Sequence, residues 1–178
     1  MTVLARLAVV VFVLVLAPAA GAAVLAYPAA QTIPATGRLP QGGTPVVSLN
    51  AAIGEREGAW LVASNARTVS ATVDGNALGP LKAQLYFGHF VSFGARAVPD
   101  ALLPWNGSAR PVERPNQPIY LQVLVPPDAR PGGYSATATV TADGKPTPIR
   151  VSIRVFAVQL PAPSALQSNL LKIGRAHV

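Results

Sequence analysis

Glu55 and Glu57 are the closest pair of carboxylates in the sequence, and they are the first candidates for chemistry. In a strand, residues i and i+2 share a face and lie about 6.5 to 7 Å apart, near the separation of the two carboxyl groups in glycosidases. However, Arg56 lies between them, and no histidine or second acidic cluster accompanies the pair. We therefore interpret the segment as the entry of a strand, and we assign no catalytic residue.

His89 and the Asn106-Gly107-Ser108 triplet are two further candidates with simpler explanations. One histidine forms neither a metal site nor a nucleophile relay without partners, so we expect His89 to be a turn or packing residue, and we expect no metal and no cofactor. The triplet fits an N-glycosylation acceptor, but Asn-Gly is also a favoured turn. We prefer the turn because the amino terminus is typical of a bacterial export signal.

Trp105, Tyr86 and Tyr120 are the candidates for binding a sugar or another domain. An exposed indole offers an apolar face and one hydrogen-bond donor, which suits stacking on a sugar ring. Trp105 lies in a long irregular segment beside Pro104 and Asn106. We consider sugar stacking and docking against a neighbouring domain for Trp105, and we favour docking because interfaces between domains also bury aromatic residues.

The elements that position these residues are predicted best around Asp143-Gly144, which suits a two-residue turn with positive φ at both positions. This turn fixes the register of a hairpin, whose apolar face then pairs Ala142 with Lys145, Val140 with Thr147, Ala138 with Ile149, Ala136 with Val151 and Tyr134 with Ile153. The other face carries threonines, arginines and a serine, as in a half-buried antiparallel sheet. Pro146 and Pro148 cannot donate to the ladder, so we expect the second strand to begin at a sheet edge.

Eight segments have the alternation or composition of strands and are separated by Gly, Asn, Asp and Pro turns, namely 46–53, 59–64, 68–73, 82–87, 90–93, 119–125, 134–142 and 147–158. No segment between them has a helical period of useful length. The pattern predicts an all-β fold, a two-sheet immunoglobulin-like β-sandwich over residues 45–160 that is preceded by a signal peptide.

The amino terminus carries the features of an export signal. Arg6 precedes an apolar run over 7–16, and small residues follow over 17–23, so we predict a signal peptide over 1–23 and a secreted or cell-surface location in a bacterium. An uncleaved membrane anchor is the alternative, although the run is shorter than the about 20 residues that span a bilayer. Residues 24–44 are rich in Ala, Pro, Gly and Thr without periodicity, which predicts a disordered leader or linker.

Composition limits the partners. The chain has 178 residues, of which 12% are charged, and a formal net charge of +7. Its basic residues are scattered rather than clustered, so we expect no nucleic-acid partner and, after signal cleavage, no membrane partner. The sequence contains no cysteine, so a packed core must stabilise the fold in place of disulfides.

The composition changes again after the last predicted strand. Prolines at 161 and 163 form a stiff spacer, and a short apolar segment follows. We therefore predict that residues 161–172 are a linker and the start of a missing domain. Residues 173–178 match one reading frame of a sequencing adapter, and we interpret them as an artefact.

Five segments in order give the chain a resemblance to a known family: 55–60, 98–104, 116–120 leading into 125–126, 131–134 and 156–161. Together they resemble the amino-terminal β-sandwich of secreted proteins related to glycoside hydrolase family 123, over about 48–163. Gly58 is a departure, because many relatives place a larger residue there. The resemblance implies that a (β/α)8 barrel follows the sandwich and holds the catalytic acids, so none of those acids is carried over to this sequence.

The resulting hypothesis is a non-catalytic accessory sandwich of an exported glycoside hydrolase, with its own carboxy-terminal catalytic domain as partner. We expect no activity from this fragment, whereas its full-length parent is expected to be a glycoside hydrolase. The alternative is a stand-alone carbohydrate-binding or cell-surface module in which Trp105, Tyr86 or Tyr120 binds a glycan. The sugar, the linkage, the oligomeric state and the docking face stay open.

Overall fold

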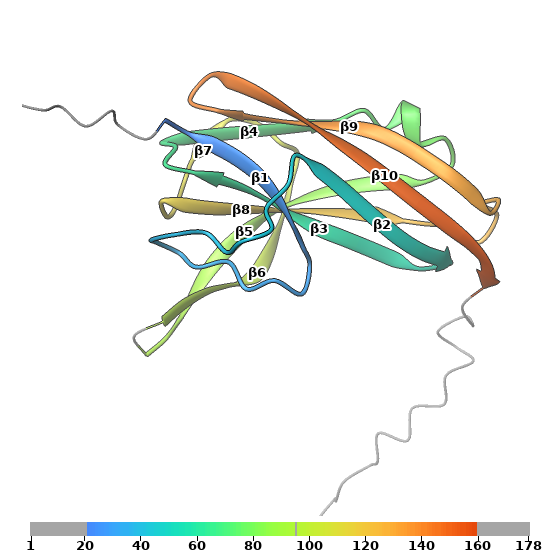
Figure 1. Ribbon diagram of the computed structural model, residues 1–178, viewed down its shortest axis with the longest axis horizontal. Helices are drawn as coiled ribbons and strands as arrows, with labels where there is room; N and C mark the ends of the chain where they lie inside the picture. Colours follow the sequence, from blue (N-terminus) through green and yellow to red (C-terminus); the bar gives the residue numbers. More distant parts are fainter. Residues whose placement is uncertain (1–20, 95, 160–178) are drawn as a thin grey trace, which may run out of the picture.

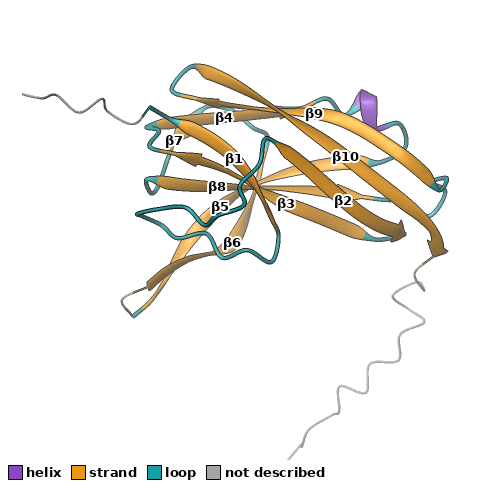
Figure 2. Cartoon of the chain, in the orientation of Figure 1, coloured by secondary structure: helices purple, strands orange, loops and turns teal. Residues whose placement is uncertain are grey.

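The computed structural model describes residues 21–94 and 96–159, which form two five-stranded sheets packed face to face (Figure 1). Figure 2 shows strands and loops throughout, and the short 3-10 helix Asn76–Leu78 is the helical element within the described ranges. In that part of the chain, no helix has the length and hydropathy of a membrane span. The predicted all-β sandwich is confirmed.

Each sheet combines one hairpin of consecutive strands with strands that are far apart in the sequence. The first, sheet 1, has the order β1-β3-β8-β5-β6, with the bounds Ala23–Pro28, Arg56–Ser64, Asn116–Leu124, Lys82–Phe93 and Arg96–Trp105. The second, sheet 2, has the order β2-β10-β9-β4-β7, with the bounds Val46–Ile53, Lys145–Gln159, Gly132–Ala142, Thr68–Val73 and Arg110–Pro111. All strand pairs are antiparallel except β2 and β10, which run parallel.

The strand order supports the immunoglobulin-like prediction. If β2, β6 and β7 are set aside, the seven remaining strands can be lettered A to G in chain order, from β1 to β10. The two sheets then have the orders β1-β3-β8-β5 and β4-β9-β10. These are the ABED and CFG sheets of a constant-type immunoglobulin domain. The fold also has a tyrosine corner, because the Tyr134 hydroxyl at the start of β9 donates to the Arg130 carbonyl over 2.7 Å.

The predicted hairpin is confirmed at every pair. β9 and β10 pair with the expected register, and Asp143 and Gly144 have φ values of 48° and 79° at the turn. Ile149 and Val151 are fully buried, whereas the alternating arginines and serine of β10 are exposed. β2 pairs with β10 only from Arg150 onward, so Pro146 and Pro148 lie where β10 pairs with β9 alone.

The core of the sandwich consists of the side chains that alternate inward along the strands of both sheets. Its largest fully buried side chains from strands are Phe87, Leu61, Ile119 and Leu121 of sheet 1 and Ile149 and Ile153 of sheet 2. Since the chain has no disulfide, burial of this apolar surface is the main favourable term in its folding.

The structure differs from the prediction in the middle of the chain. Predicted strands 82–87 and 90–93 are one strand, β5, whose pairing with β6 shifts between His89 and Phe90. β6 itself, where we expected an irregular segment, contains Pro99 and Pro104 and lies at the edge of sheet 1, where proline is tolerated. The prolines masked its strand pattern.

The structure also differs over 24–44, where we expected a disordered leader. β1 pairs with β3 along its whole length, and Ile33 is fully buried in the loop that follows. The Asn116 amide holds this loop by donating to the carbonyls of Pro34 and Gly37 over 3.0 and 3.1 Å. Residues 24–44 are ordered by contacts with β3 and Asn116, which lie far along the chain, so the composition of the segment alone does not reveal its order. Residues 1–20 of the predicted signal over 1–23 lie outside the described residues, as do the predicted linker, missing domain and adapter over 161–178.

Candidate functional site

Trp105, the first candidate for binding, is a core residue. It ends β6, is 8% exposed, and packs edge-on against Phe87 with the ring centroids 5.7 Å apart. Its indole nitrogen donates to the Ser108 carbonyl over 3.1 Å. With its ring in the core and its donor occupied, Trp105 presents no surface for stacking on a sugar, and its burial is explained without a neighbouring domain.

The Asn106-Gly107-Ser108 triplet lies between β6 and β7 and forms an Asx turn, closed by the Asn106 side chain, instead of a two-residue Asn-Gly turn. Gly107 has a φ of 82°, and the Asn106 side-chain oxygen accepts from the Ser108 backbone N–H over 3.0 Å. A Cβ at Gly107 would collide with the Ala71 carbonyl oxygen, so glycine is required here by both backbone conformation and space.

Tyr86 and Tyr120, the other two candidates, lie together on the outer face of sheet 1. With Trp60 they form one cross-strand row over β3, β8 and β5, which we call the aromatic row. The Trp60 and Tyr120 ring centroids are 5.0 Å apart and nearly perpendicular, and those of Tyr120 and Tyr86 are 6.5 Å apart. Sequence reasoning missed Trp60, because the row appears only when two strand registers are combined.

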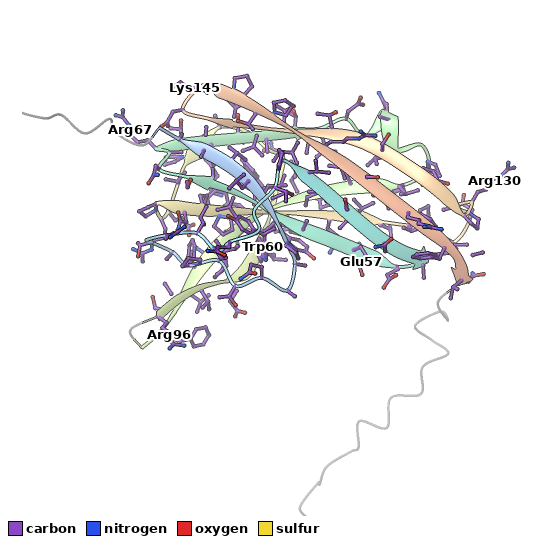
Figure 3. All side chains as sticks on the ribbon, viewed as in Figure 1. Glu57, Trp60, Arg67, Arg96, Arg130 and Lys145 are labelled. Carbon is purple, nitrogen blue, oxygen red and sulfur yellow. The ribbon has the colours of Figure 1, made fainter. Side chains whose placement is uncertain are left out.

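One end of the aromatic row is covered. Trp60, labelled in Figure 3, is 7% exposed, and its indole nitrogen donates to the Ala29 carbonyl over 3.1 Å. Together with Tyr27, Ile33 and Val62 it forms a second small cluster beneath the loop that follows β1. Only the two tyrosines at the other end are half-buried, so the accessible part of the row is Tyr120 and Tyr86.

Gly58 explains how Tyr120 is positioned. A Cβ added at Gly58 would lie 2.6 Å from both Cζ and Oη of Tyr120 and 2.5 Å from the Leu121 carbonyl oxygen. The end of the Tyr120 ring therefore lies across β3, above the glycine. A glycine inside a strand often marks such a close approach. The departure noted in the sequence at Gly58 thus has a structural reason.

Polar groups flank the two tyrosines. The Gln122 side-chain oxygen accepts from Arg56 Nη1 over 3.2 Å and from the Tyr86 hydroxyl over 3.4 Å. Burial raises the pKa of Tyr120, and the nearby Glu57 carboxylate and Tyr86 raise it further. The Tyr120 hydroxyl therefore stays protonated at neutral pH and can donate a hydrogen bond.

Glu55 and Glu57 are close together, as their spacing predicts, but they serve the turn between β2 and β3. The Glu55 carboxylate accepts from the Ala52 backbone N–H over 2.6 Å. Burial raises the pKa of Glu57, the Glu55 carboxylate raises it further, and the Gly58 N–H partly opposes this. This arrangement agrees with the interpretation of the segment as a strand entry.

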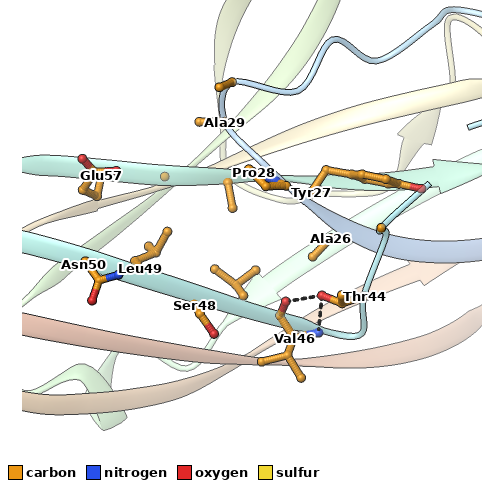
Figure 4. Close-up of a pocket in the computed structure, with 15 residues that line it drawn as sticks. Ala26, Tyr27, Pro28, Ala29, Thr44, Val46, Ser48, Leu49, Asn50 and Glu57 are labelled. Carbon is orange, nitrogen blue, oxygen red and sulfur yellow. Dashed lines mark hydrogen bonds between the residues drawn. The ribbon is translucent and has the colours of Figure 1, made fainter. Parts of the chain in front are cut away.

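A pocket of about 610 Å³ lies between the end of β1, the edge strand β2 and the start of β3 (Figure 4). Glu57 is its one carboxylate, and the other walls are mostly small and apolar. At its entrance the Thr44 hydroxyl donates to the Val46 carbonyl over 2.6 Å. Polar groups suited to fixing a ligand are few, so we regard the aromatic row as the better candidate site.

His89 stabilises the irregularity between β5 and β6. Its Nδ1 lies 2.9 Å from Glu113 Oε2, and the same carboxylate oxygen accepts from the Phe90 backbone N–H over 3.4 Å. Residues 21–94 and 96–159 hold no group of three or more potential metal ligands. His89 is exposed and lies within β5 beside the register shift, so it is neither in a turn nor packed in the core.

Comparisons with known proteins show the fold. No protein-family model matches the chain, and no curated protein matches it. Among solved structures, it is similar to a family 123 glycoside hydrolase from Clostridium perfringens, with a TM-score of 0.59 and 16% identity over 81% of this chain and 29% of that chain.

Two more distant similarities are to the N-terminal domain of PorA (TM-score 0.42, 9% identity, 76% of this chain and 99% of that chain) and to WR4, a C. elegans MSP family member (TM-score 0.38, 8% identity, 63% and 93%). The chain spans less than a third of the length of the hydrolase. At 16% identity the likeness to the hydrolase shows a shared β-sandwich fold, in agreement with the resemblance seen in the sequence.

Proposed function

We propose that this β-sandwich is a non-catalytic accessory module of an exported protein related to family 123 glycoside hydrolases, and that it braces a catalytic domain that follows it. The observation that carries the proposal is the likeness to the Clostridium perfringens hydrolase, which covers 81% of this chain but 29% of that chain. The larger part of that enzyme thus has no counterpart in the matched region.

The end of β10 supports a contact with a following domain. Phe156 and Val158 are 42% and 58% exposed, although both are large and apolar. The partner strand β9 begins opposite Val155, so these side chains lie beyond the hairpin pairing, in the last residues of β10, whose arrowhead lies at the right of Figure 1. Exposed apolar side chains grouped at such a place suit an interface between domains.

Recovering the reading frame beyond the codon for Lys172 tests the proposal. We expect a continuation of about 250 residues or more in which strands and helices alternate, the size and pattern of a (β/α)8 barrel. A natural stop codon close to Lys172 would overturn the accessory role. Hydrolysis of aryl N-acetylhexosaminides by the present chain would also contradict it, because we place the catalytic acids outside this sequence.

A stand-alone carbohydrate-binding or cell-surface module is the second candidate. The observation that favours it is the open tyrosine end of the aromatic row, which does not depend on any further domain. An early natural stop codon would therefore favour this alternative.

A further inference from the structure

The outward side chains of β3, β8 and β5 form three adjacent rows on sheet 1. Next to the aromatic row lies a second row, the amide row, formed by Gly58, Gln122 and Gln84. Beyond it lies a third row, the basic row, formed by Arg56, Leu124 and Lys82. Neighbouring rows are about 7 Å apart, so the three rows form one continuous face.

We propose that this face binds a pyranose glycan that carries carboxylate groups, such as a chain of uronic or sialic acid residues. The inference is independent of the accessory role proposed above, because it concerns only these three rows. Ring stacking and hydrogen bonding favour a sugar as the ligand, and the charge of the basic row favours an acidic one.

The aromatic row supplies the stacking surface. Because Gly58 has no side chain, the Tyr120 ring can lie across β3 instead of standing upright on the sheet. Tyr120 stays half-buried in this position, and Tyr86, also half-buried, extends the surface on the next strand with the two ring centroids 6.5 Å apart. Aromatic faces of this kind pack against the C–H groups of a sugar ring, while the hydroxyl provides a polar contact.

The amide row supplies hydrogen-bond donors. The Gln122 oxygen already accepts from Arg56 and Tyr86, so the two donors fix the orientation of this amide. Its NH2 group makes no hydrogen bond to the described residues, which leaves two N–H donors directed away from that network. Gln84 is directly opposite on β5, and its side-chain NH2 already donates one hydrogen bond to the Leu85 carbonyl over 3.0 Å, which leaves one N–H donor. Hydroxyl and carboxylate oxygens of a sugar are suitable acceptors for these groups.

The basic row decides the charge of the ligand. Arg56 and Lys82 are both exposed and lie on either side of Leu124. None of the nine positions in the three rows is Asp or Glu, and their charged side chains are Arg56 and Lys82. The Glu57 carboxylate lies near Tyr120, so the positive charge is concentrated at the basic row. By contrast, the basic residues labelled in Figure 3 are spread over separate parts of the molecule. Charge complementarity therefore favours a glycan with carboxylates over a neutral one.

A glycan array that carries uronic-acid, sialic-acid and neutral oligosaccharides tests the proposal with the full chain. We expect signals from acidic pyranose glycans and signals at least about tenfold weaker from neutral glycans of the same length. Binding of the strongest acidic oligosaccharide, measured by titration calorimetry, should weaken as salt is raised, because the basic row is exposed.

Variants of the three rows connect binding to the proposed face. Tyr120→Ala should weaken binding about tenfold, whereas Tyr120→Phe, which keeps the ring, should retain most of it. Arg56→Gln and Lys82→Gln should each weaken it about twofold to fivefold at low salt. Arg150→Gln, on the exposed face of sheet 2, is the matched charge control and should have no effect. Circular dichroism of each variant verifies that the fold is intact.

Three results would overturn the proposal. The first is an array without signal from any acidic glycan. The second is equal binding of acidic and neutral glycans. The third is binding that folded Tyr120→Ala retains in full, or that Arg150→Gln loses as strongly as Arg56→Gln.

Discussion

The outer faces of the two sheets follow the same alternation, yet they present different chemistry. On sheet 2 the outward residues of β9 and β10 are mostly Thr, Ser and Arg, which contact solvent as separate side chains. On sheet 1 the outward residues Trp60, Tyr120 and Tyr86 contact one another across three strands. Alternation within a strand therefore decides which residues face outward, whereas the registers between distant strands decide which outward residues come together in a site.

The largest effect should come from breaking the core that both faces share. Ile149 is fully buried, so Ile149→Ala should lower the free energy of unfolding by about 3 to 4 kcal/mol through lost burial and a new cavity. Ser152, exposed on the same strand, is the control, and Ser152→Ala should change it by less than about 0.5 kcal/mol. Urea denaturation measures both. Equal effects of the two substitutions would contradict the assigned faces.

A glycine on each face sharpens the comparison. Gly58→Ala places a Cβ against the Tyr120 ring and the Leu121 carbonyl, so it should destabilise the protein by about 1 to 3 kcal/mol. Gly133 of β9 has no atom within 4 Å of an added Cβ, so Gly133→Ala should be neutral or slightly stabilising. Thermal unfolding followed by circular dichroism compares the two. A neutral Gly58→Ala would show that the ring does not lie over this strand.

A smaller effect is expected at the tyrosine corner. Tyr134→Phe removes the hydrogen bond to the Arg130 carbonyl and keeps the ring, so stability should fall by about 1 kcal/mol. On sheet 1, Tyr86→Phe removes the longer bond to Gln122 and should cost less than Tyr134→Phe. Urea denaturation of the two variants gives the order, and a larger loss for Tyr86→Phe would reverse our ranking.

The smallest effect should be the dependence of stability on pH, and it has opposite signs for two carboxylates. Hydrogen bonds from the N–H groups of Thr68 and Arg67 lower the pKa of Asp143 in the folded protein. The stability due to Asp143 is therefore present above its unfolded pKa and is lost as pH falls through the folded pKa. Burial raises the pKa of Glu57, so its stabilising contribution is present below the unfolded pKa and is lost as pH rises through the folded pKa.

Melting temperatures of the Asp143→Asn and Glu57→Gln variants between about pH 3 and pH 7 measure these two contributions. Asp143→Asn should flatten the loss of stability on the acid side, because an amide oxygen can still accept the two N–H groups but no longer titrates. Glu57→Gln should instead gain stability relative to the unchanged protein as pH rises. Parallel curves for the two variants would contradict the opposite signs.

Local signals in the sequence were sufficient for the hairpin and most strands. Asp143-Gly144 fixed a turn, and the period of two then placed Ile149 and Val151 in the core. Trp105, which we expected at a domain interface or a sugar site, is a core residue, because its burial depends on the pairing of β5 with β6, which prolines concealed. Trp60 was missed as part of the site because its row requires the registers of both β3 and β5 against β8, and such long-range pairing has no signature in a single segment.

The parallel pairing of β2 with β10 has a mechanical consequence. Tension that enters β2 at Val46 and leaves β10 at Gln159 would slide the two strands past each other, so their backbone hydrogen bonds would be loaded together rather than one after another. Pulling the β9–β10 hairpin apart at its open end would instead break its bonds in sequence. Force spectroscopy along the two directions should therefore give a higher unfolding force for the first.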